Sequence, residues 1–265
     1  MKTSIAVHGA CGRMGKRIVQ LAHEDADLRL VAALDAPTHP DHGKDIGELC
    51  GFGRSGVKVT AGIPGNSAIE AVIDFSMPDG TMTILKECVT HKIPLVVATT
   101  GFSPEQKAEI ASAAHQTAIL FAPNMSLVVN VLFKLVKEAA AALKDKGFDA
   151  EIIERHHRFK KDAPSGTAIQ FAREIQDVWG DDFAIQHGRE GLVGERPAKE
   201  IGMHSLRAGD NVGEHTIVFS TLGETMELVH KGHTRDAYVR GALAAAKFLA
   251  GKPPGTYSMN DVLGL

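Results

Sequence analysis

Short apolar runs alternate with amphipathic stretches along the first half of the chain. The apolar runs are almost continuous in Val, Ile, Ala and Leu. They cover residues 4–8, 28–34, 71–75, 94–99 and 117–122. Stretches with helical spacing lie between them, at residues 13–23, 79–91 and 104–116. Strands that are apolar on both faces and separated by helices are typical of a doubly wound parallel sheet. The pattern therefore predicts an α/β fold of that kind.

The pattern changes after Asn124. Residues 125–146 predict one long helix with an alanine-rich middle. A mixed segment follows, with expected strands at residues 150–157, 214–221 and 225–230 and expected helices at residues 165–179 and 236–250. The last two strands flank a short turn and have the pattern of an antiparallel pair. Regular alternation followed by a mixed segment indicates two domains, joined by a short hinge near Asn124.

Composition and charge narrow the class of protein. The 265 residues include 29 Lys and Arg against 32 Asp and Glu, so no concentrated cationic surface for nucleic acid is expected. No apolar run approaches the roughly 20 residues that span a bilayer, and the first residues have no signal-like segment. The three cysteines are scattered and lack metal-ligand spacing. We therefore expect a cytoplasmic protein with reduced thiols, no metal site, and neither nucleic acid nor a membrane as partner.

A glycine-rich segment, Gly9-Ala10-Cys11-Gly12-Arg13-Met14-Gly15, follows the first expected strand and opens the first expected helix. Glycines let the backbone approach a pyrophosphate closely, and the helix N-terminus attracts the anion. Asp35 ends the second strand, 20 residues after Gly15, where a carboxylate is expected on the adenosine ribose hydroxyls. Ala36 and Pro37 follow in place of an arginine for a 2′-phosphate. The sequence predicts a dinucleotide site, with NADH favoured and NADPH as the second cofactor.

Two other loops lie at the ends of expected core strands, where doubly wound sheets bind their ligands. They are Ala98-Thr99-Thr100-Gly101 and Ala122-Pro123-Asn124-Met125. Small residues and a hydroxyl suit a backbone that runs beside a nicotinamide ring. The Asn124 carboxamide would bond to the cofactor or fix the hinge. Spacing alone does not distinguish these roles from those of ordinary loops.

The strongest chemical signal is the segment from Glu154 to Ala168. Five of the six residues from Arg155 to Lys160 are cationic or protonatable, and Pro-Ser-Gly-Thr then begins a helix. Helix amides and the Thr167 hydroxyl suit one carboxylate of a small dianion, and the basic side chains suit the other. Histidine also exchanges protons near neutral pH. The alternative is a solvated basic loop without a ligand.

Four segments together resemble the 4-hydroxy-tetrahydrodipicolinate reductase family, long called dihydrodipicolinate reductases. They are Gly-Ala-Cys-Gly-Arg-Met-Gly at 9–15, Ala-Thr-Thr-Gly-Phe at 98–102, the basic segment at 154–168, and Arg-Ala-Gly-Asp-Asn-Val-Gly-Glu-His-Thr at 207–216. The resemblance runs from Ile5 to Leu263. It implies NAD(P)H-dependent reduction of a small dicarboxylate in the diaminopimelate route to lysine.

The resemblance also implies a particular domain arrangement. Residues 1–126 and 236–265 would form a Rossmann-type dinucleotide-binding domain. Residues 127–235 would form an inserted α+β domain that binds substrate and assembles a homotetramer. The two domains would close about hinges near Asn124 and Asp236.

The family's site residues transfer to matching positions of this sequence. The proton donors fall on His156 and Lys160, and the substrate carboxylates would meet His157, Lys160, Gly166 and Thr167. The implied cofactor contacts are Gly9, Ala10, Cys11, Gly12, Arg13, Met14, Asp35, Ala98, Thr99, Thr100, Ala122, Pro123, Asn124 and Met125. Three residues depart from the family pattern and affect the expected cofactor affinity or polar contacts: Phe159, Ala98 and Met77.

The implied chemistry is hydride transfer to C4 of a cyclic imine, followed by protonation of the neighbouring carbon. His156 and Lys160 both remain as the proton donor, and dehydration on or off the enzyme is open. Two other functions fit the glycine loop: another NAD(P)-dependent oxidoreductase of a small acidic substrate, or a non-catalytic NADH sensor.

Overall fold

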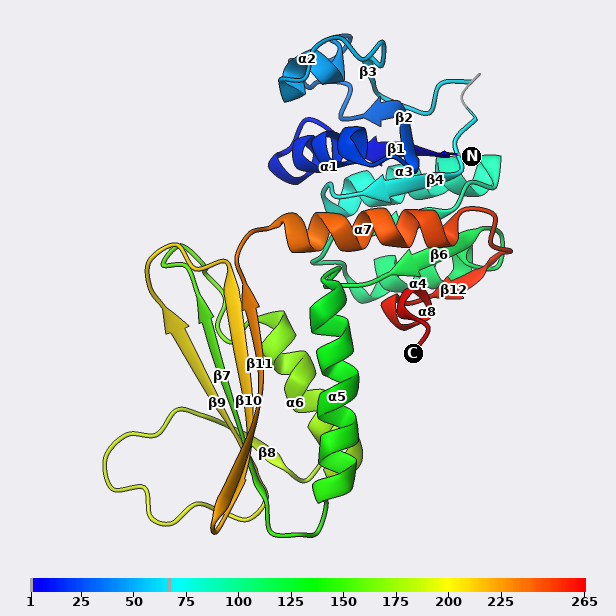
Figure 1. The fold of residues 1–265 in the computed structure, drawn as a ribbon. Coiled ribbons are helices and arrows are strands. Elements are labelled where there is room, and N and C mark those ends of the chain that lie inside the picture. Colours follow the sequence, from blue (N-terminus) through cyan, green and yellow to red (C-terminus); the bar gives the residue numbers. More distant parts are fainter. Residues whose placement is uncertain (1, 66–67) are drawn as a thin grey trace. The chain divides into compact units, whose positions relative to one another are not determined.

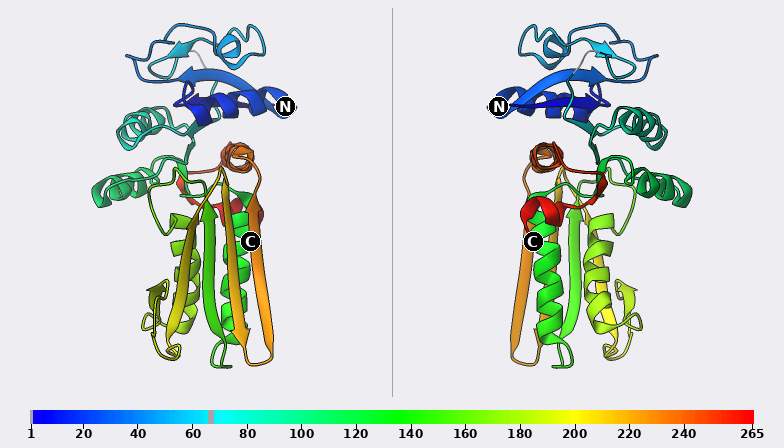
Figure 2. Two further views of the ribbon diagram at one scale, coloured as in Figure 1. Left: turned by 90° about the vertical axis from the view of Figure 1, so that its left-hand side faces the viewer. Right: turned by 90° about the vertical axis from the view of Figure 1, so that its right-hand side faces the viewer.

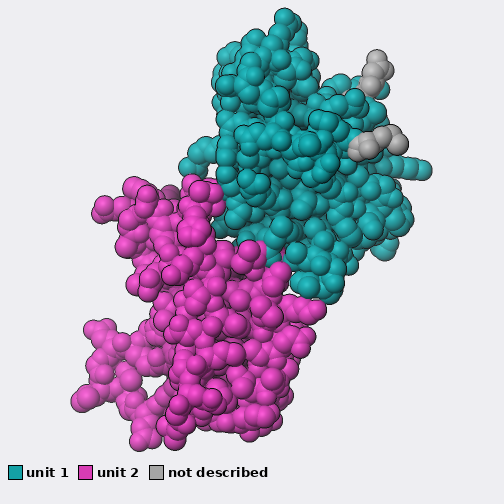
Figure 3. All heavy atoms as spheres, in the orientation of Figure 1, with its two compact units in different colours: residues 1–127, 236–265 teal, residues 128–235 magenta. Residues whose placement is uncertain are grey.

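The chain forms two compact units, each with its own sheet and core. The structure, a computed structural model, describes residues 2–65 and 68–265. Unit 1 contains residues 1–127 and 236–265, and unit 2 contains residues 128–235 (Figure 3). No helix in these described ranges is long and apolar enough to cross a membrane.

Unit 1 is built on a seven-stranded sheet with the order β12-β6-β5-β4-β1-β2-β3 (Figure 1). Its strands are β1 (Thr3–His8), β2 (Leu28–Leu34), β3 (Val59–Thr60), β4 (Ala71–Asp74), β5 (Leu95–Val97), β6 (Ala118–Phe121) and β12 (Gly255–Tyr257). All neighbouring strands are parallel. The sheet grows outward from β1 in both directions, so the predicted doubly wound α/β fold is confirmed.

Helices cover both faces of this sheet. They are α1 (Arg13–Glu24), α2 (Ile46–Cys50), α3 (Pro78–His91), α4 (Pro104–Ala113), α7 (Asp236–Leu249) and α8 (Met259–Leu263). Ile5 and Val7 of β1 share one apolar core with α1 and α7, whereas Ala6 between them shares a second core with α3 and α4. Because successive side chains of a strand point to opposite faces, these two cores lie on opposite sides of the sheet. Both faces are buried, as the continuous apolar runs predicted.

Unit 2 is a mixed five-stranded sheet with two long helices on one face (Figure 2). The strand order is β11-β10-β7-β9-β8. The elements are α5 (Leu127–Leu143), β7 (Asp149–His156), α6 (Gly166–Trp179), β8 (Ala184–His187), β9 (Glu200–Arg207), β10 (Gly213–Thr221) and β11 (Glu224–Gly232). Strand β10 is antiparallel to both neighbours, so the predicted antiparallel pair is confirmed. Phe171 of α6 and Phe219 of β10 lie fully buried in the core between the helices and the sheet.

Candidate active site

The glycine loop of unit 1 is packed so closely that side chains would not fit. Gly9 has φ +74°, and a Cβ there would lie 2.7 Å from the carbonyl oxygen of Phe75. A Cβ at Gly15 would lie 2.0 Å from the carbonyl oxygen of Gly9. Helix α1 begins after Gly12 with no side-chain cap and no acidic residue in its first turn. The loop therefore presents a positive helix end to an anion, as a dinucleotide pyrophosphate requires.

Asp35 holds this loop from the end of β2. Its Oδ2 accepts a hydrogen bond from the amide of Cys11 at 2.8 Å, and its Oδ1 accepts one from the amide of Ala36 at 2.8 Å. These two hydrogen bonds fix the half-buried carboxylate beside the loop. The predicted residues Gly9 to Met14 and Asp35 therefore lie together at the carboxyl edge of the sheet.

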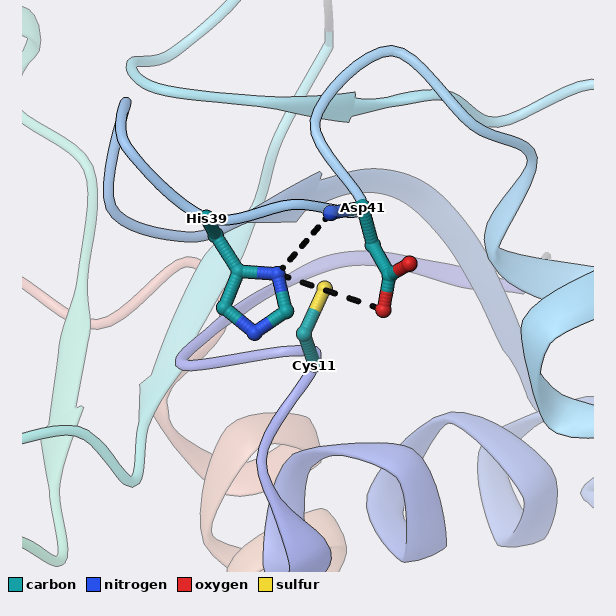
Figure 4. A group of neighbouring side chains, drawn as sticks. All are labelled: Cys11, His39 and Asp41. Carbon is teal, nitrogen blue, oxygen red and sulfur yellow. Dashed lines mark hydrogen bonds and ion pairs between the residues drawn. The ribbon is translucent and has the colours of Figure 1, made fainter.

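His39 and Asp41 extend this cluster around the Cys11 thiol (Figure 4). The thiol, one His39 ring nitrogen and one Asp41 oxygen lie within 4.8 Å of one another. His39 Nδ1 accepts the amide of Asp41 at 3.2 Å, and Asp41 Oδ1 is 2.7 Å from Lys44 Nζ. Burial, followed by the Asp35 and Asp41 carboxylates, raises the pKa of the Cys11 thiol to about 12. Cys11 is a protonated thiol between two carboxylates, and the ring nitrogen already has a hydrogen-bond partner.

Thr99 is positioned by a buried carboxylate that the sequence did not single out. Its hydroxyl donates to Asp74 Oδ2 at 2.8 Å and accepts the amide of Ser76 at 3.0 Å. Asp74 is fully buried at the end of β4 and also accepts hydrogen bonds from Thr81 and Ser76, at 2.6 Å each. His8 Nδ1 lies 2.7 Å from its second oxygen. Four side chains thus converge on one carboxylate directly behind the predicted Ala98 to Thr100 loop.

The Ala122 to Met125 loop also has a defined structural role. Asn124 Oδ1 accepts the amide of Ser126 at 2.9 Å, which forms the turn into α5. A Cβ at Gly241 of α7 would lie 1.7 Å from the Met125 carbonyl oxygen. The segment that leads from unit 1 into α5 is therefore held in two ways: the Asn124 side chain bonds to it, and Gly241 of α7 packs closely against Met125. Asn124 fixes this turn, and its two predicted roles, a contact with the cofactor and the fixing of the hinge, stay predictions.

In unit 2, the basic segment lies between β7 and α6. Strand β7 ends at His156, and Ser165 caps α6 by accepting the amide of Ala168 at 3.2 Å. No acidic residue lies in the first turn of α6, which contains Gly166 and Thr167. The start of this loop is held at the end of β9, because the Ala208 amide donates to the His156 carbonyl at 3.1 Å. His156, at the end of β7, and Gly166, at the start of α6, are therefore joined by one short loop within unit 2.

Lys160 makes an ion pair within this loop. Its Nζ lies 2.8 Å from Asp162 Oδ2 and 2.9 Å from Asp162 Oδ1. The nearby ammonium group lowers the pKa of Asp162. Lys161 is exposed, and Phe159 is 77% exposed. Of the two adjacent lysines, Lys160 faces a carboxylate, as it would face a substrate carboxylate.

Buried polar atoms without partners gather in this unit. Within residues 2–65 and 68–265, all such side-chain atoms belong to it: His157 Nδ1, Arg207 Nε, Asn211 Oδ1, His215 Nδ1 and His230 Nδ1. Burial is the main reason why the pKa of His215 falls to about 3, so this ring is neutral. Its Nε2 lies 3.3 Å from the Ser165 hydroxyl, and its ring contacts His156 edge-on. These atoms have no partner within the described protein, and a bound group or an ordered water would satisfy them.

Comparisons with known proteins agree with this geometry. The family model for the dihydrodipicolinate reductase N-terminus matches residues 3–125, and the model for its C-terminus matches residues 128–263. A 4-hydroxy-tetrahydrodipicolinate reductase of Rhodopirellula baltica is 48% identical over 99% of this chain and 96% of its own length. The corresponding protein of Syntrophotalea carbinolica is 44% identical over 98% of both chains.

A solved structure shares the fold over nearly the whole chain. The dipicolinate-bound dihydrodipicolinate reductase of Paenisporosarcina sp. TG-14 is 26% identical, with a TM-score of 0.76 over 97% of this chain and 98% of its own. An amine dehydrogenase of Mycobacterium smegmatis, 12% identical with a TM-score of 0.58, shares the fold alone. Both family models and the full-length relatives lead to one conclusion: the chain belongs to the dihydrodipicolinate reductase family.

Proposed function

We infer that the protein reduces 4-hydroxy-tetrahydrodipicolinate to tetrahydrodipicolinate, as an NAD(P)H-dependent oxidoreductase of lysine and diaminopimelate biosynthesis. The observation that carries this function is the basic loop of unit 2, which runs from His156 to the N-terminus of α6. Another oxidoreductase of a small acidic substrate would share the glycine loop but would not need a cation cluster for a dianion that leads into Ser-Gly-Thr, and a non-catalytic NADH sensor would turn over no substrate.

Two parts of the basic loop suit the two carboxylates of the substrate. The first turn of α6, with Gly166 and Thr167, offers backbone amides and the positive helix end to one carboxylate. Lys160 and His157 would bind the other carboxylate. The ion pair with Asp162 supports this role, because the Lys160 ammonium group already donates to a carboxylate in this position. Substrate binding would then displace Asp162 from Lys160.

The chain's own residues would control the proton that completes the reduction. The nicotinamide of the bound dinucleotide supplies a hydride to C4 of the cyclic imine. His156 or Lys160 would donate a proton to the neighbouring carbon, since His156 ends β7 and Lys160 lies in the basic loop that follows it. His156 Nδ1 is bonded to Glu154, so its Nε2 would be the donor atom.

For the cofactor, we propose that NADH is preferred over NADPH. Asp35 and Asp41 both lie beside Cys11, and both contribute to the raised pKa of its thiol. Two carboxylates at the expected ribose position would repel a 2′-phosphate, and no arginine follows Asp35 to offset them. Asp35 would accept the ribose hydroxyls. Thr99 and Thr100 would lie beside the nicotinamide, with Thr99 fixed by Asp74.

We also propose that unit 2 assembles a homotetramer in the cytoplasm. The helices cover one face of its sheet, whereas Val229 of β11 is 45% exposed and Leu206 of β9 is 44% exposed. Strand β11 is also an edge strand, with backbone groups available for pairing. A second copy of the chain would cover both features. The three free cysteines, Cys11, Cys50 and Cys88, fit a reducing compartment.

A coupled assay tests the proposed function. The preceding synthase generates the substrate from pyruvate and aspartate semialdehyde, and the absorbance of NADH is followed after this protein is added. We expect rapid loss of NADH that depends on the synthase. Oxidation of NADH with other small imino or oxo acids, but not with the synthase product, would indicate another oxidoreductase. Binding of NADH without turnover of any substrate would indicate a sensor.

A further inference from the structure

A buried carboxylate, Glu154, lies at the centre of the candidate substrate site. Its side chain is completely buried at the end of β7, on the same face as His156. Oε2 lies 2.5 Å from His156 Nδ1 and 2.8 Å from Arg207 Nη1. Oε1 accepts Arg207 Nη2 at 2.7 Å and the Ser165 amide at 3.1 Å. One side chain thus connects the histidine, the half-buried Arg207 and the cap of α6.

Glu154 does not supply a proton itself. Burial alone would raise its pKa, but the hydrogen bonds from His156 and Arg207 outweigh burial and lower the pKa well below its usual range. The carboxylate is therefore ionised and acts only as an acceptor. Its partners are two cationic or protonatable groups and one amide, so its charge is balanced within the site.

The hydrogen bond to Nδ1 determines which nitrogen of His156 faces outward. With Nδ1 held by Glu154, Nε2 points toward the start of β10, where a Cβ at Gly213 would lie 3.0 Å from it. Gly213 has no side chain, so no Cβ crowds Nε2 within this buried site. A carboxylate on one ring nitrogen fixes the ring orientation and the position of the proton on the other.

We propose that Glu154 is a positioning residue for the reduction: it holds His156 with Nε2 directed into the substrate site, and it secures the N-terminus of α6 through the Ser165 amide. This inference rests on the proposed function, because it assumes that His156 takes part in protonation. Arg207 completes the arrangement by donating to the Asp162 carbonyl at 2.7 Å, which ties the middle of the loop to the same carboxylate.

The chain offers a matched control on the same strand. Glu151 of β7 also holds a histidine and two arginines: His204 Nε2 at 2.7 Å, Arg189 Nη2 at 2.8 Å and Arg196 Nε at 3.1 Å. These contacts lower its pKa to about 2 although burial opposes them. Because Glu151 and Glu154 are three residues apart on a strand, their side chains point to opposite faces of the sheet. Glu151 therefore has similar partners but no contact with His156.

The experiment compares Glu154→Asp, Glu154→Gln and Glu151→Gln by steady-state kinetics and by NADH titration. Aspartate keeps the charge beside Arg207 but withdraws the carboxylate by one methylene, so this variant tests positioning even if Glu154→Gln does not fold. We expect kcat to fall by at least about 10²-fold in Glu154→Asp, since the shorter side chain no longer reaches His156 Nδ1 and the ring that would donate the proton is no longer oriented. NADH affinity should not change, and Glu151→Gln should retain nearly full turnover.

A double variant identifies the route of the effect. If Glu154 acts through His156, then Glu154→Asp combined with His156→Asn should be no slower than His156→Asn alone. Additive losses, or equal turnover in Glu154→Asp and Glu151→Gln, would overturn the role of Glu154. Wild-type turnover in His156→Asn would instead show that the proposed role of His156 in the reaction is wrong.

Discussion

Replacing Lys160 and Lys161 separately by alanine tests whether the basic loop has one specific cation or only a general positive charge. Lys160 Nζ lies 2.8 Å from Asp162, and its side chain is 21% exposed. Lys161 is exposed, and no ion pair of it occurs in the described part of the chain. The two lysines are adjacent and carry the same charge, so their long-range electrostatic effect is nearly equal. Only contact with the substrate should distinguish them.

The size of the effect follows from the exposure of the pair. Asp162 is 62% exposed, and ion pairs of this kind contribute at most about 1 kcal/mol to stability. Lys160→Ala should therefore fold normally. If Lys160 donates the proton and also binds a carboxylate, kcat should fall by at least about 10²-fold and the KM for substrate should rise, because a general acid contributes about 10²–10⁴-fold to turnover. Lys161→Ala should change neither constant appreciably.

Asp162 provides an independent measurement of the same contact. If its carboxylate competes with the substrate for Lys160, then Asp162→Asn should lower the substrate KM, by up to about fivefold for a pair worth about 1 kcal/mol. Steady-state kinetics on the three variants, with NADH affinity measured separately, checks all of these values. Equal behaviour of Lys160→Ala and Lys161→Ala would refute the assignment and leave the loop as a non-specific electrostatic attractor.

Three further predictions concern the cofactor, the assembly and the pH dependence of stability. Asp35→Ala should shift the ratio of NADH to NADPH affinity toward NADPH in binding titrations, whereas a strong wild-type preference for NADPH would contradict the charge argument. Light scattering should give about four times the chain mass of 28.3 kDa, and a monomer would exclude the proposed assembly. His215 has a folded pKa of about 3 against 6.5, so the unfolded chain binds its proton first as the pH falls. The free energy of unfolding should then decrease by up to about 1.4 kcal/mol per pH unit below pH 6.5, and His215→Phe should flatten this slope in denaturant titrations.

The apolar runs of unit 1 predicted five of its seven strands, because each run is short and lies between stretches with helical spacing. The run at residues 28–34 is β2 in full. The long helix was expected at 125–146 and runs from Leu127 to Leu143, because the Asn124 side chain forms a turn before it. Boundaries set by single hydrogen bonds of this kind are not visible in a hydrophobic pattern.

The region 180–212 gave no predicted element, although it contains β8 and β9. Ile201 and Met203 of β9 face the core, whereas Glu200, which is 7% exposed and bonds to Arg189, lies on the opposite face of the sheet. Two apolar residues beside a charged one are too short a pattern to predict a strand, and the partner of Glu200 comes from another segment. Strand β9 is held by parallel pairing with β7, about fifty residues earlier in the sequence, and such pairing leaves no local pattern.

The distance in sequence between a residue and its partners also explains which candidate site residues the sequence predicted. The predicted ligand contacts belong to loops whose glycines, hydroxyls or cations are recognisable where they stand in the sequence. Asp74 and Glu154, in contrast, were not assigned any role, because each is an ordinary acidic residue until its partners are known. The partners of Asp74 lie up to 66 residues away, and Arg207 is 53 residues from Glu154. A buried carboxylate is costly unless several donors converge on it, so its presence at zero exposure implies that the surrounding segments are held in fixed positions. In each unit, one such carboxylate lies directly behind the loop proposed to bind a ligand. The residues proposed to contact the ligands could therefore be predicted from local sequence, whereas Asp74 and Glu154, which hold Thr99 and His156, could be identified only in the fold.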